Sequence, residues 1–308
     1  MSEYDHAKHD HAKHDHAKHD HAKHDHAKHD HAKHDHDGGL ARDLPLLTRR
    51  RIVAGFGVAG VAGVAGGTAW LLGGGAGQSE ANLTGTAADG TVCLKDPAEA
   101  AGPFPADGTN ARAGQSVNAL TQSGVVRDDM RASFGGLAGE AGGVPMVLDI
   151  TLVDVARACA PLAGHAIYLW HADAEGRYSL YDLPGQNYLR GVVVTDAGGK
   201  ARITTIVPGC YAGRWPHVHF QVFAGLDAAV SGTASLLTSQ FALPQDGLAA
   251  VYAAEARYPA STANLTRLTL TGDMVFAGNT EDQIAAQTLA MTADAAGFAA
   301  AVTVGIAA

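Results

Sequence analysis

Short apolar runs separated by turn residues follow one another along the middle of the chain. They are rich in Val, Ile and aromatic side chains and are bounded by Gly, Pro and Asp, which is typical of β-strands. Strands of this length at spacings of roughly ten to twenty residues favour two packed sheets. The pattern therefore predicts a mainly β protein, a β-sandwich with strands at residues 147–153, 166–171, 191–195, 200–207 and 216–223.

Less regular elements surround these expected strands. Residues 251–257, introduced by an Asp-Gly pair, are predicted to form a short helix. Residues 80–140 are rich in Gly and Ala and include Pro103 and Pro105, so we expect coil that wraps the sandwich. Further strands are expected at residues 268–276, 289–292 and 299–306.

The N-terminal part has a different pattern. From His6 to Asp35 the chain repeats the pentad His-Ala-Lys-His-Asp six times. A five-residue period fits neither a helix face nor a strand and supplies no large apolar side chain, so residues 1–37 are predicted to be disordered. Two interpretations stay open: a weak, multivalent sink for soft divalent metals, or low-complexity sequence without a role.

Residues 38–79 have the features of an export signal. Arg49, Arg50 and Arg51 precede an uncharged run, residues 52–72, that is rich in Gly, Ala and Val. Paired arginines before a weakly hydrophobic stretch indicate a twin-arginine signal. We therefore expect export by the twin-arginine machinery to the cell envelope or exterior, with residues 80–308 as the mature domain. The alternative is an uncleaved membrane anchor; cleavage would also remove the His-rich repeat.

Charge and cysteine usage narrow the class of the mature domain. Residues 80–308 carry 12 Lys and Arg against 21 Asp and Glu, so they hold the whole net charge of −9. An acidic domain without basic clusters argues against nucleic-acid binding. Three cysteines exclude a four-cysteine zinc or iron–sulfur site. Export permits a disulfide: Cys93 and Cys159 are the natural pair, and Cys210 is expected to be a buried free thiol.

Two histidines stand two positions apart on one expected strand. Residues i and i+2 of a strand point to the same face, so His217 and His219 present two imidazoles side by side, a geometry suited to one metal ion. Histidines packed in a core or on a surface are the alternative. The nearest additional candidate ligands upstream are Tyr178 and Tyr211, each beside a glycine at a turn.

Ordered motifs over about fifty residues then make the chain resemble the intradiol ring-cleavage dioxygenases, the protocatechuate and catechol dioxygenase family. Weaker similarity runs from about Cys93 to the end of the chain. The chain lacks the N-terminal helical domain of catechol dioxygenases, so the similarity is to the stand-alone, exported branch. The motifs are WHADAEGRY at 170–178, LRG at 189–191 with TD at 195–196, TIVPGCY at 205–211 and GRWPHVHF at 213–220.

The resemblance implies a set of site residues. In this family two tyrosines and two histidines hold Fe(III), and an arginine and a glutamine line the site. Tyr211 matches the ligand that leaves the metal and takes a substrate proton, and Arg214 matches the arginine that places the substrate. Gln240 is the counterpart of the glutamine. The matching ligand positions are Tyr178, Tyr211, His217 and His219.

Four nearby residues are set aside as ligands. Tyr181 and Tyr188 do not follow the Gly-Arg element that precedes Tyr178. His165 and His171 alternate with apolar residues on one strand face, so we expect them in the core or behind the ligands.

The resemblance also implies the reaction: O2-dependent cleavage of a catechol-type ring between its two hydroxyl-bearing carbons, giving a muconate-type diacid. Only six positions separate Tyr211 from His217, where well-studied members carry a longer substrate-contacting loop, so the particular catechol is not implied. Family members commonly form homo-oligomers. Two alternatives remain: a non-catalytic exported β-sandwich binding module, and a metal-handling envelope protein that uses the His-rich repeat.

Overall fold

The structure is a computed structural model that describes residues 83–308. The predicted repeat and export signal, residues 1–37 and 38–79, lie outside the described residues. The domain boundaries and the export route therefore stay predictions. Among residues 83–308, no helix is both long enough and apolar enough to cross a membrane.

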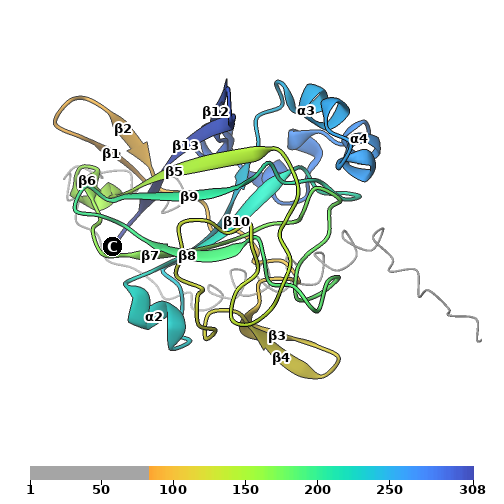
Figure 1. Ribbon diagram of the computed structural model, residues 1–308. Helices are drawn as coiled ribbons and strands as arrows, with labels where there is room; N and C mark the ends of the chain where they lie inside the picture. Colours follow the sequence, from red (N-terminus) through yellow and green to blue (C-terminus); the bar gives the residue numbers. More distant parts are fainter. Residues whose placement is uncertain (1–82) are drawn as a thin grey trace, which may run out of the picture. The chain divides into compact units, whose positions relative to one another are not determined.

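Within the described residues two sheets pack face to face, with the β5–β9 layer over the β7, β8 and β10 layer (Figure 1). The first sheet has the order β11-β10-β7-β8, and all its neighbouring strands are antiparallel. The second has the order β12-β13-β5-β6, with β9 also paired to β5. The first sheet comprises β7 (Ala166–Trp170), β8 (Arg190–Val194), β10 (His217–Phe223) and β11 (Leu237–Ala242). The second comprises β5 (Pro145–Asp154), β6 (Ala160–Pro161), β9 (Lys200–Ile206), β12 (Ala290–Asp294) and β13 (Gly297–Ile306).

Alternating apolar positions from both sheets form the core between them. Leu148 and Ile150 of β5 lie in one buried cluster with Ile167 and Leu169 of β7. Side chains on one face of a strand repeat every second residue, so these pairs point inward from opposite layers. This mainly β sandwich confirms the predicted fold class, and the five strands expected between residues 147 and 223 are present with small shifts at their ends.

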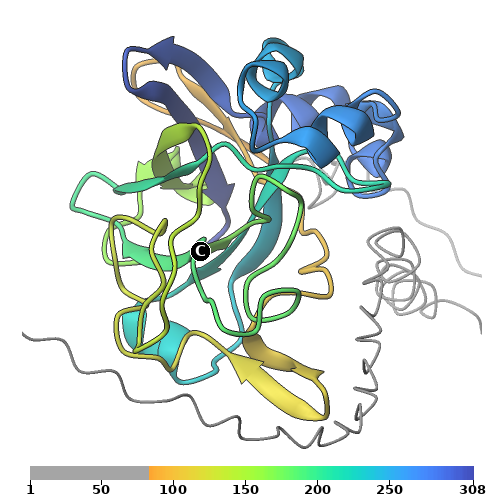
Figure 2. The same ribbon diagram turned by 45° about the vertical axis from the view of Figure 1, so that its right-hand side comes forward.

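Short helices, 3₁₀ turns and two hairpins surround the sandwich within residues 83–308. Figure 2 shows α3 and α4 at one end of the sheets, with α2 and the β3–β4 hairpin at the other. The helices are α2 (Leu226–Val230), α3 (Leu248–Ala254), α4 (Pro259–Leu265) and α5 (Glu281–Gln287). The hairpin strands are β1 (Thr84–Thr86), β2 (Val92–Leu94), β3 (Asp107–Arg112) and β4 (Gln115–Asn118). The 3₁₀ turns are η3 (Val155–Arg157), η4 (Leu270–Gly272) and η5 (Phe276–Gly278).

Three local expectations differ from the structure. The helix expected at 251–257 lies at Leu248–Ala254. Gly247 precedes it with a φ of 85°, a conformation that glycine adopts without strain, and the helix begins at the next residue. The strand expected at 268–276 is wrong. Side chains there bond the local backbone: Thr269 Oγ1 accepts from the Gly272 amide and Asp273 Oδ1 from the Val275 amide, which favours 3₁₀ turns. Residues 80–140 were expected to be coil throughout, but they include both hairpins.

Candidate metal centre

The two candidate histidines lie on the face of the first sheet that points away from the sandwich core. On β10, Val218 and Phe220 belong to the core cluster between the sheets. His217 and His219 alternate with them and are buried on the opposite face. There the Trp170 indole stacks on the His219 ring at a centroid distance of 4.8 Å and an interplanar angle of 2°. The strand period thus places both imidazoles on one face of the sheet, outside the core.

A row of paired residues crosses this face of the sheet. His219 is the register partner of Gln240 on β11 and of Trp170 on β7, and Trp170 is the partner of Arg190 on β8. All four side chains are buried. Directly paired residues in a sheet point to the same face, so the pairing brings Gln240 beside the histidines although 21 residues separate it from His219.

Tyr178 is positioned by a turn that follows β7. Asp173 organises this turn: its carboxylate accepts hydrogen bonds from the backbone amides of Glu175 and Arg177, at 2.9 and 3.0 Å, and forms an ion pair with the Arg177 guanidinium. Gly176 has a φ of 82°, where a side chain would be strained and a Cβ would lie 2.9 Å from a backbone oxygen of the neighbouring loop. The Gly-Arg-Tyr motif therefore turns the chain so that the phenol faces the histidines.

Tyr211 is carried by the loop between β9 and β10, which interlocks with the Tyr178 turn. The Gly209 amide donates to the Asp173 carbonyl at 3.1 Å. Ser261 of α4 joins the two loops, because its hydroxyl donates to the Ala174 carbonyl at 2.9 Å and accepts from the Cys210 amide at 3.0 Å. These contacts fix the spacing between the two tyrosines.

Three of the candidate ligands converge, and the ring of the fourth, Tyr211, lies beside them. The Tyr178 Oη lies 3.3 Å from the Nε2 of His217 and 3.2 Å from the Nε2 of His219, and the two Nε2 atoms are 3.0 Å apart. The Tyr211 ring centroid lies 5.9 Å from those of both Tyr178 and His217. Two ligands bound about 2.1 Å from one ion at right angles are about 3.0 Å apart. The separations between the Tyr178 oxygen and the two imidazole nitrogens therefore fit donors around a single metal ion.

Both imidazoles are in the form that a metal requires. Burial, together with the nearby positive charge of Arg214, lowers the pKa of His217 to about 3. Burial and the His217 ring lower the pKa of His219 well below its usual range. The Nδ1 of His217 donates to the Trp215 carbonyl, which leaves the Nε2 lone pair facing the Tyr178 oxygen. The rings are thus neutral near pH 7.

Arg214 and Gln240 lie together beside this cluster. The Arg214 guanidinium donates to the Gln240 Oε1, and the Gln240 amide nitrogen donates to the Ala100 carbonyl at 2.8 Å. The Arg214 Nε donates to Asp273 at 3.0 Å, and both charged side chains are almost fully buried. The structure therefore brings both predicted substrate-side residues to the same place as the histidines.

The residues that were set aside have other partners. His171 is buried, with Nε2 2.7 Å from the Thr205 hydroxyl and Nδ1 2.7 Å from the Ala172 carbonyl, and half-buried His165 faces the Ala163 carbonyl. Tyr181 donates to Asn110, and Tyr188 donates to Asp173. Within residues 83–308, no group of three or more His, Cys, Asp or Glu side chains forms a metal site. A centre at His217 and His219 therefore needs the phenols.

The expected cysteine pairing is confirmed. Cys93 and Cys159 form a disulfide. Cys210 is a buried free thiol whose Sγ donates to the Ser261 carbonyl, and burial raises its pKa to about 12. A thiol held in this state is a poor nucleophile and metal ligand.

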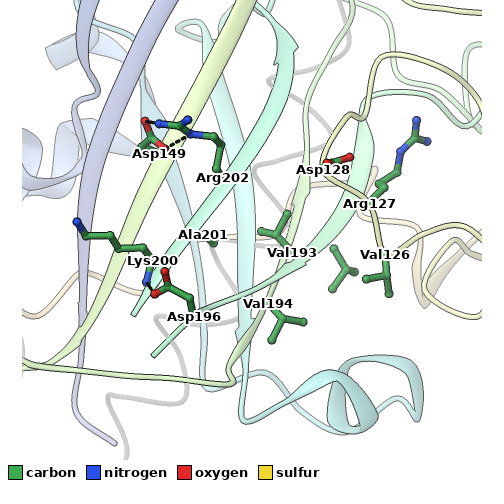
Figure 3. Close-up of a pocket in the computed structure, with 11 residues that line it drawn as sticks. Val126, Arg127, Asp128, Asp149, Val193, Val194, Asp196, Lys200, Ala201 and Arg202 are labelled. Carbon is green, nitrogen blue, oxygen red and sulfur yellow. Dashed lines mark hydrogen bonds and ion pairs between the residues drawn. The ribbon is translucent and has the colours of Figure 1, made fainter. Parts of the chain in front are cut away.

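A charged pocket elsewhere on the fold does not share this chemistry (Figure 3). It lies where β5, β8 and β9 meet residues 126–128. Asp149 and Arg202 form an exposed ion pair there at 2.6 Å, and the Lys200 amide donates to the Asp196 carboxylate. The pocket contains none of the predicted ligands, so it does not compete with the centre at β10.

Sequence reasoning missed two residues that support the candidate centre. Asp273 lies in a segment that was expected to be a strand, and Ser261 lies in a helix that was not expected at all. Asp273 contacts Arg214 across a sequence separation of 59 residues, and Ser261 contacts Cys210, the neighbour of Tyr211, across 51. The only sequence signal was their type: Asp before a 3₁₀ turn and Ser in a Pro-initiated helix.

Comparisons with known proteins agree with the geometry. A family model described as dioxygenase matches residues 127–271, which include the four candidate ligands, Arg214 and Gln240. The chain is 34% identical over 109 residues to catechol 1,2-dioxygenase 1 of Acinetobacter lwoffii, covering 29% of this chain and 33% of that protein. It is 34% identical over 82 residues to the chlorocatechol 1,2-dioxygenase of Pseudomonas sp. strain P51, covering 20% and 33%. The matches thus span about a third of each relative's length.

A solved structure shares the fold. The intradiol ring-cleavage dioxygenase of Tetranychus urticae superposes with a TM-score of 0.51 at 18% identity, covering 70% of this chain and 94% of that one. The motifs around Tyr178 and His219 lie within the segment that the family model matches. The matched family model and the two relatives indicate a member of the intradiol ring-cleavage dioxygenase family.

Proposed function

We propose that this protein cleaves a catechol-type aromatic ring between its two hydroxyl-bearing carbons, using O2 and yielding a muconate-type diacid. The observation that carries this proposal is the convergence of Tyr178, His217 and His219 within 3.0–3.3 Å, with the Tyr211 ring beside them. A non-catalytic binding module of the same fold would not require these side chains to lie together.

Fe(III) is the metal that fits this donor set. Members of the family normally use non-haem iron. Two phenolate oxygens supply negative charge and hard donors, which favour ferric over ferrous iron, while the two neutral imidazoles complete the set. Tyr178, Tyr211, His217 and His219 would hold the ion. When bound, Fe(III) supplies the coordination and the electron acceptance that make a catechol reactive toward O2.

The chain's own residues have separate tasks in this proposal. The Tyr211 phenolate takes a proton from one substrate hydroxyl, for which a basic oxygen near the ligand cluster is required. Arg214 lies beside Gln240 and places the substrate by charge-assisted contact with its anionic oxygen. The aromatic rings of Trp170 and Phe104, packed 4.8 Å from those of His219 and Tyr178 respectively, limit water around the ligands.

The proposal includes export as a twin-arginine substrate, with residues 80–308 as the catalytic domain. The Cys93–Cys159 disulfide supports this part, because disulfides persist mainly in oxidising compartments. The signal and the repeat lie outside the described residues, and a homo-oligomer stays a prediction.

The test is oxygen incorporation. Full-length protein loaded with Fe(III) is supplied with catechol under ¹⁸O₂, and oxygen uptake and the product mass are measured. We expect one O2 consumed per catechol and both labelled atoms in a ring-opened diacid. A product that carries no label, or no turnover of any catechol by protein whose iron content is stoichiometric, would refute the proposed activity.

A further inference from the structure

Asp273 is not one of the predicted site residues, but it hydrogen-bonds to residues beside the candidate metal centre. Its Oδ2 accepts hydrogen bonds from the Arg214 Nε at 3.0 Å and from the Trp215 backbone amide at 2.7 Å. The Oδ1 accepts from the Val275 amide at 2.8 Å. Asp273 is 2% exposed and lies just beyond the matched family segment. Both carboxylate oxygens are thus saturated by donors, and the side chain has a single orientation.

The first contact of Asp273 is with Arg214, the residue proposed to place the substrate. Its ion pair with Arg214 is buried, with side-chain exposures of 1% and 0%. A guanidinium carries several donors in a rigid fork, so fixing its Nε at Asp273 also fixes the direction of the donor that meets the Gln240 Oε1. The orientation of the Arg214 charge toward the ligand cluster therefore depends on Asp273.

The second route leads from Asp273 to a candidate ligand. The Trp215 amide is bound by Asp273, and the Trp215 carbonyl accepts from the His217 Nδ1. The carboxylate therefore anchors the backbone that orients the His217 imidazole. Partners behind a metal-bound histidine commonly set its orientation and basicity.

From these two routes we infer that Asp273 is a positioning residue that aligns the substrate-side Arg214 and the metal-side His217 with one carboxylate. The inference rests on the proposed function only for its substrate half; its effect on metal affinity is independent of turnover. Asp273 does not touch the ligand cluster itself, so its action is through Arg214 and Trp215.

The test is Asp273→Asn in the full-length protein. One oxygen becomes an NH2 group, which must face either the Val275 amide or the Trp215 and Arg214 donors, so donor opposes donor in both orientations. We expect Fe(III) affinity, measured by chelator competition, to fall about 10- to 100-fold. The KM for catechol should rise by a similar factor, with a smaller change in kcat.

A double-mutant cycle separates positioning from general damage. Arg214→Gln should raise the KM for catechol while the hydrogen bonds from Asp273 to Trp215 and from Trp215 to His217 stay in place. If Asp273 acts through Arg214, the KM of the double variant should equal that of Arg214→Gln alone, whereas independent effects would multiply. The matched control is Asp149→Asn, which removes one partner of the exposed Arg202 pair and should leave both quantities unchanged.

The Fe(III) affinity and the KM of these variants decide whether Asp273 is a positioning residue. Wild-type Fe(III) affinity and KM in Asp273→Asn, or fully multiplicative effects in the double variant, would overturn it. If wild-type protein binds iron but turns over no catechol, the proposed activity fails while the metal-affinity comparison still decides the role of Asp273. Should Asp273→Asn not fold, the same measurements are made on Asp273→Glu, which keeps two acceptor oxygens on a longer side chain. An unchanged KM and an unchanged iron affinity in that variant would refute the inference. A shift in both quantities would support it.

Discussion

Replacing Tyr178 with Phe tests the candidate ligand set by removing a single oxygen atom. The Tyr178 ring contacts Phe104 at a centroid distance of 4.8 Å and Tyr211 at 5.9 Å, and a Phe ring would keep both contacts. The lost oxygen is the atom that lies 3.2–3.3 Å from both imidazoles. We therefore expect Fe(III) affinity to fall by at least about tenfold, since even losing a partner behind a ligand costs that much.

Tyr181→Phe is the matched control for this change. Tyr181 is also buried and packs on Phe104, but its hydroxyl accepts from the Ala106 amide at 2.9 Å and donates to Asn110 at 2.6 Å. Removing it leaves the fully buried Ala106 N–H without a partner, which costs about 1–3 kcal/mol. In a domain of this size each kcal/mol lowers the Tm by about 2–4 °C.

The two variants should therefore show opposite effects: one should lose iron binding and keep its Tm, and the other should keep iron binding and lose Tm. Iron titration followed by absorbance, together with calorimetry of the iron-free protein, should show Tyr178→Phe losing iron with a Tm near that of wild type. Tyr181→Phe should keep its iron and lose Tm. The reasoning would be refuted if Tyr178→Phe bound Fe(III) as tightly as wild type, or if both variants lost iron equally.

Further predictions concern the support around the tyrosines and the disulfide. Ser261→Ala removes the hydroxyl that joins the two tyrosine-bearing loops and should weaken Fe(III) binding; Thr262→Val, which loses hydrogen bonds only to α3 and to the start of α4, should lower Tm alone. Gly209→Ala would place a Cβ 2.6 Å from two backbone oxygens, so we expect low yields of folded protein and little bound iron. Replacing both Cys93 and Cys159 with Ser should cost about 2–5 kcal/mol in urea unfolding and leave iron content unchanged.

Each of these has a clear contrary result. Equal iron affinity in Ser261→Ala and Thr262→Val would mean that the link between the loops does not position the tyrosines. A Gly209→Ala protein that folds and holds iron normally would mean that the loops can separate without loss. Loss of iron in the double Ser variant would mean that the disulfide acts on the site and not only on the stability of the fold.

The strand pattern was sufficient to predict that two histidines share one face of a strand. Apolar and polar positions alternate along β10, so the period of two already placed His217 and His219 on one face. The glycine-marked turns made Tyr178 and Tyr211 candidates, and the resemblance to the intradiol dioxygenases assigned them as ligands. These features are local, because each depends on a few neighbouring residues along the chain.

The parts that the sequence did not reveal depend on distant partners. Strand β11 escaped the pattern because Thr238, Ser239 and Gln240 are polar yet buried, whereas polar side chains normally mark a solvent-facing strand edge or a loop. The segment around Asp273 contains enough apolar residues for a strand, but its side-chain caps close 3₁₀ turns. The partner of Asp273 is Arg214, which lies 59 residues away along the chain. Only the fold brings the two side chains together, so the sequence spacing does not reveal the pair.

The most direct test of the account is resonance Raman spectroscopy of the Fe(III)-loaded full-length protein, excited in its visible absorption band. We expect a coloured protein with phenolate vibrations from two tyrosinates, and the loss of one set in Tyr178→Phe. A colourless iron complex, or phenolate bands that are identical in wild type and Tyr178→Phe, would contradict a centre built from Tyr178, Tyr211, His217 and His219.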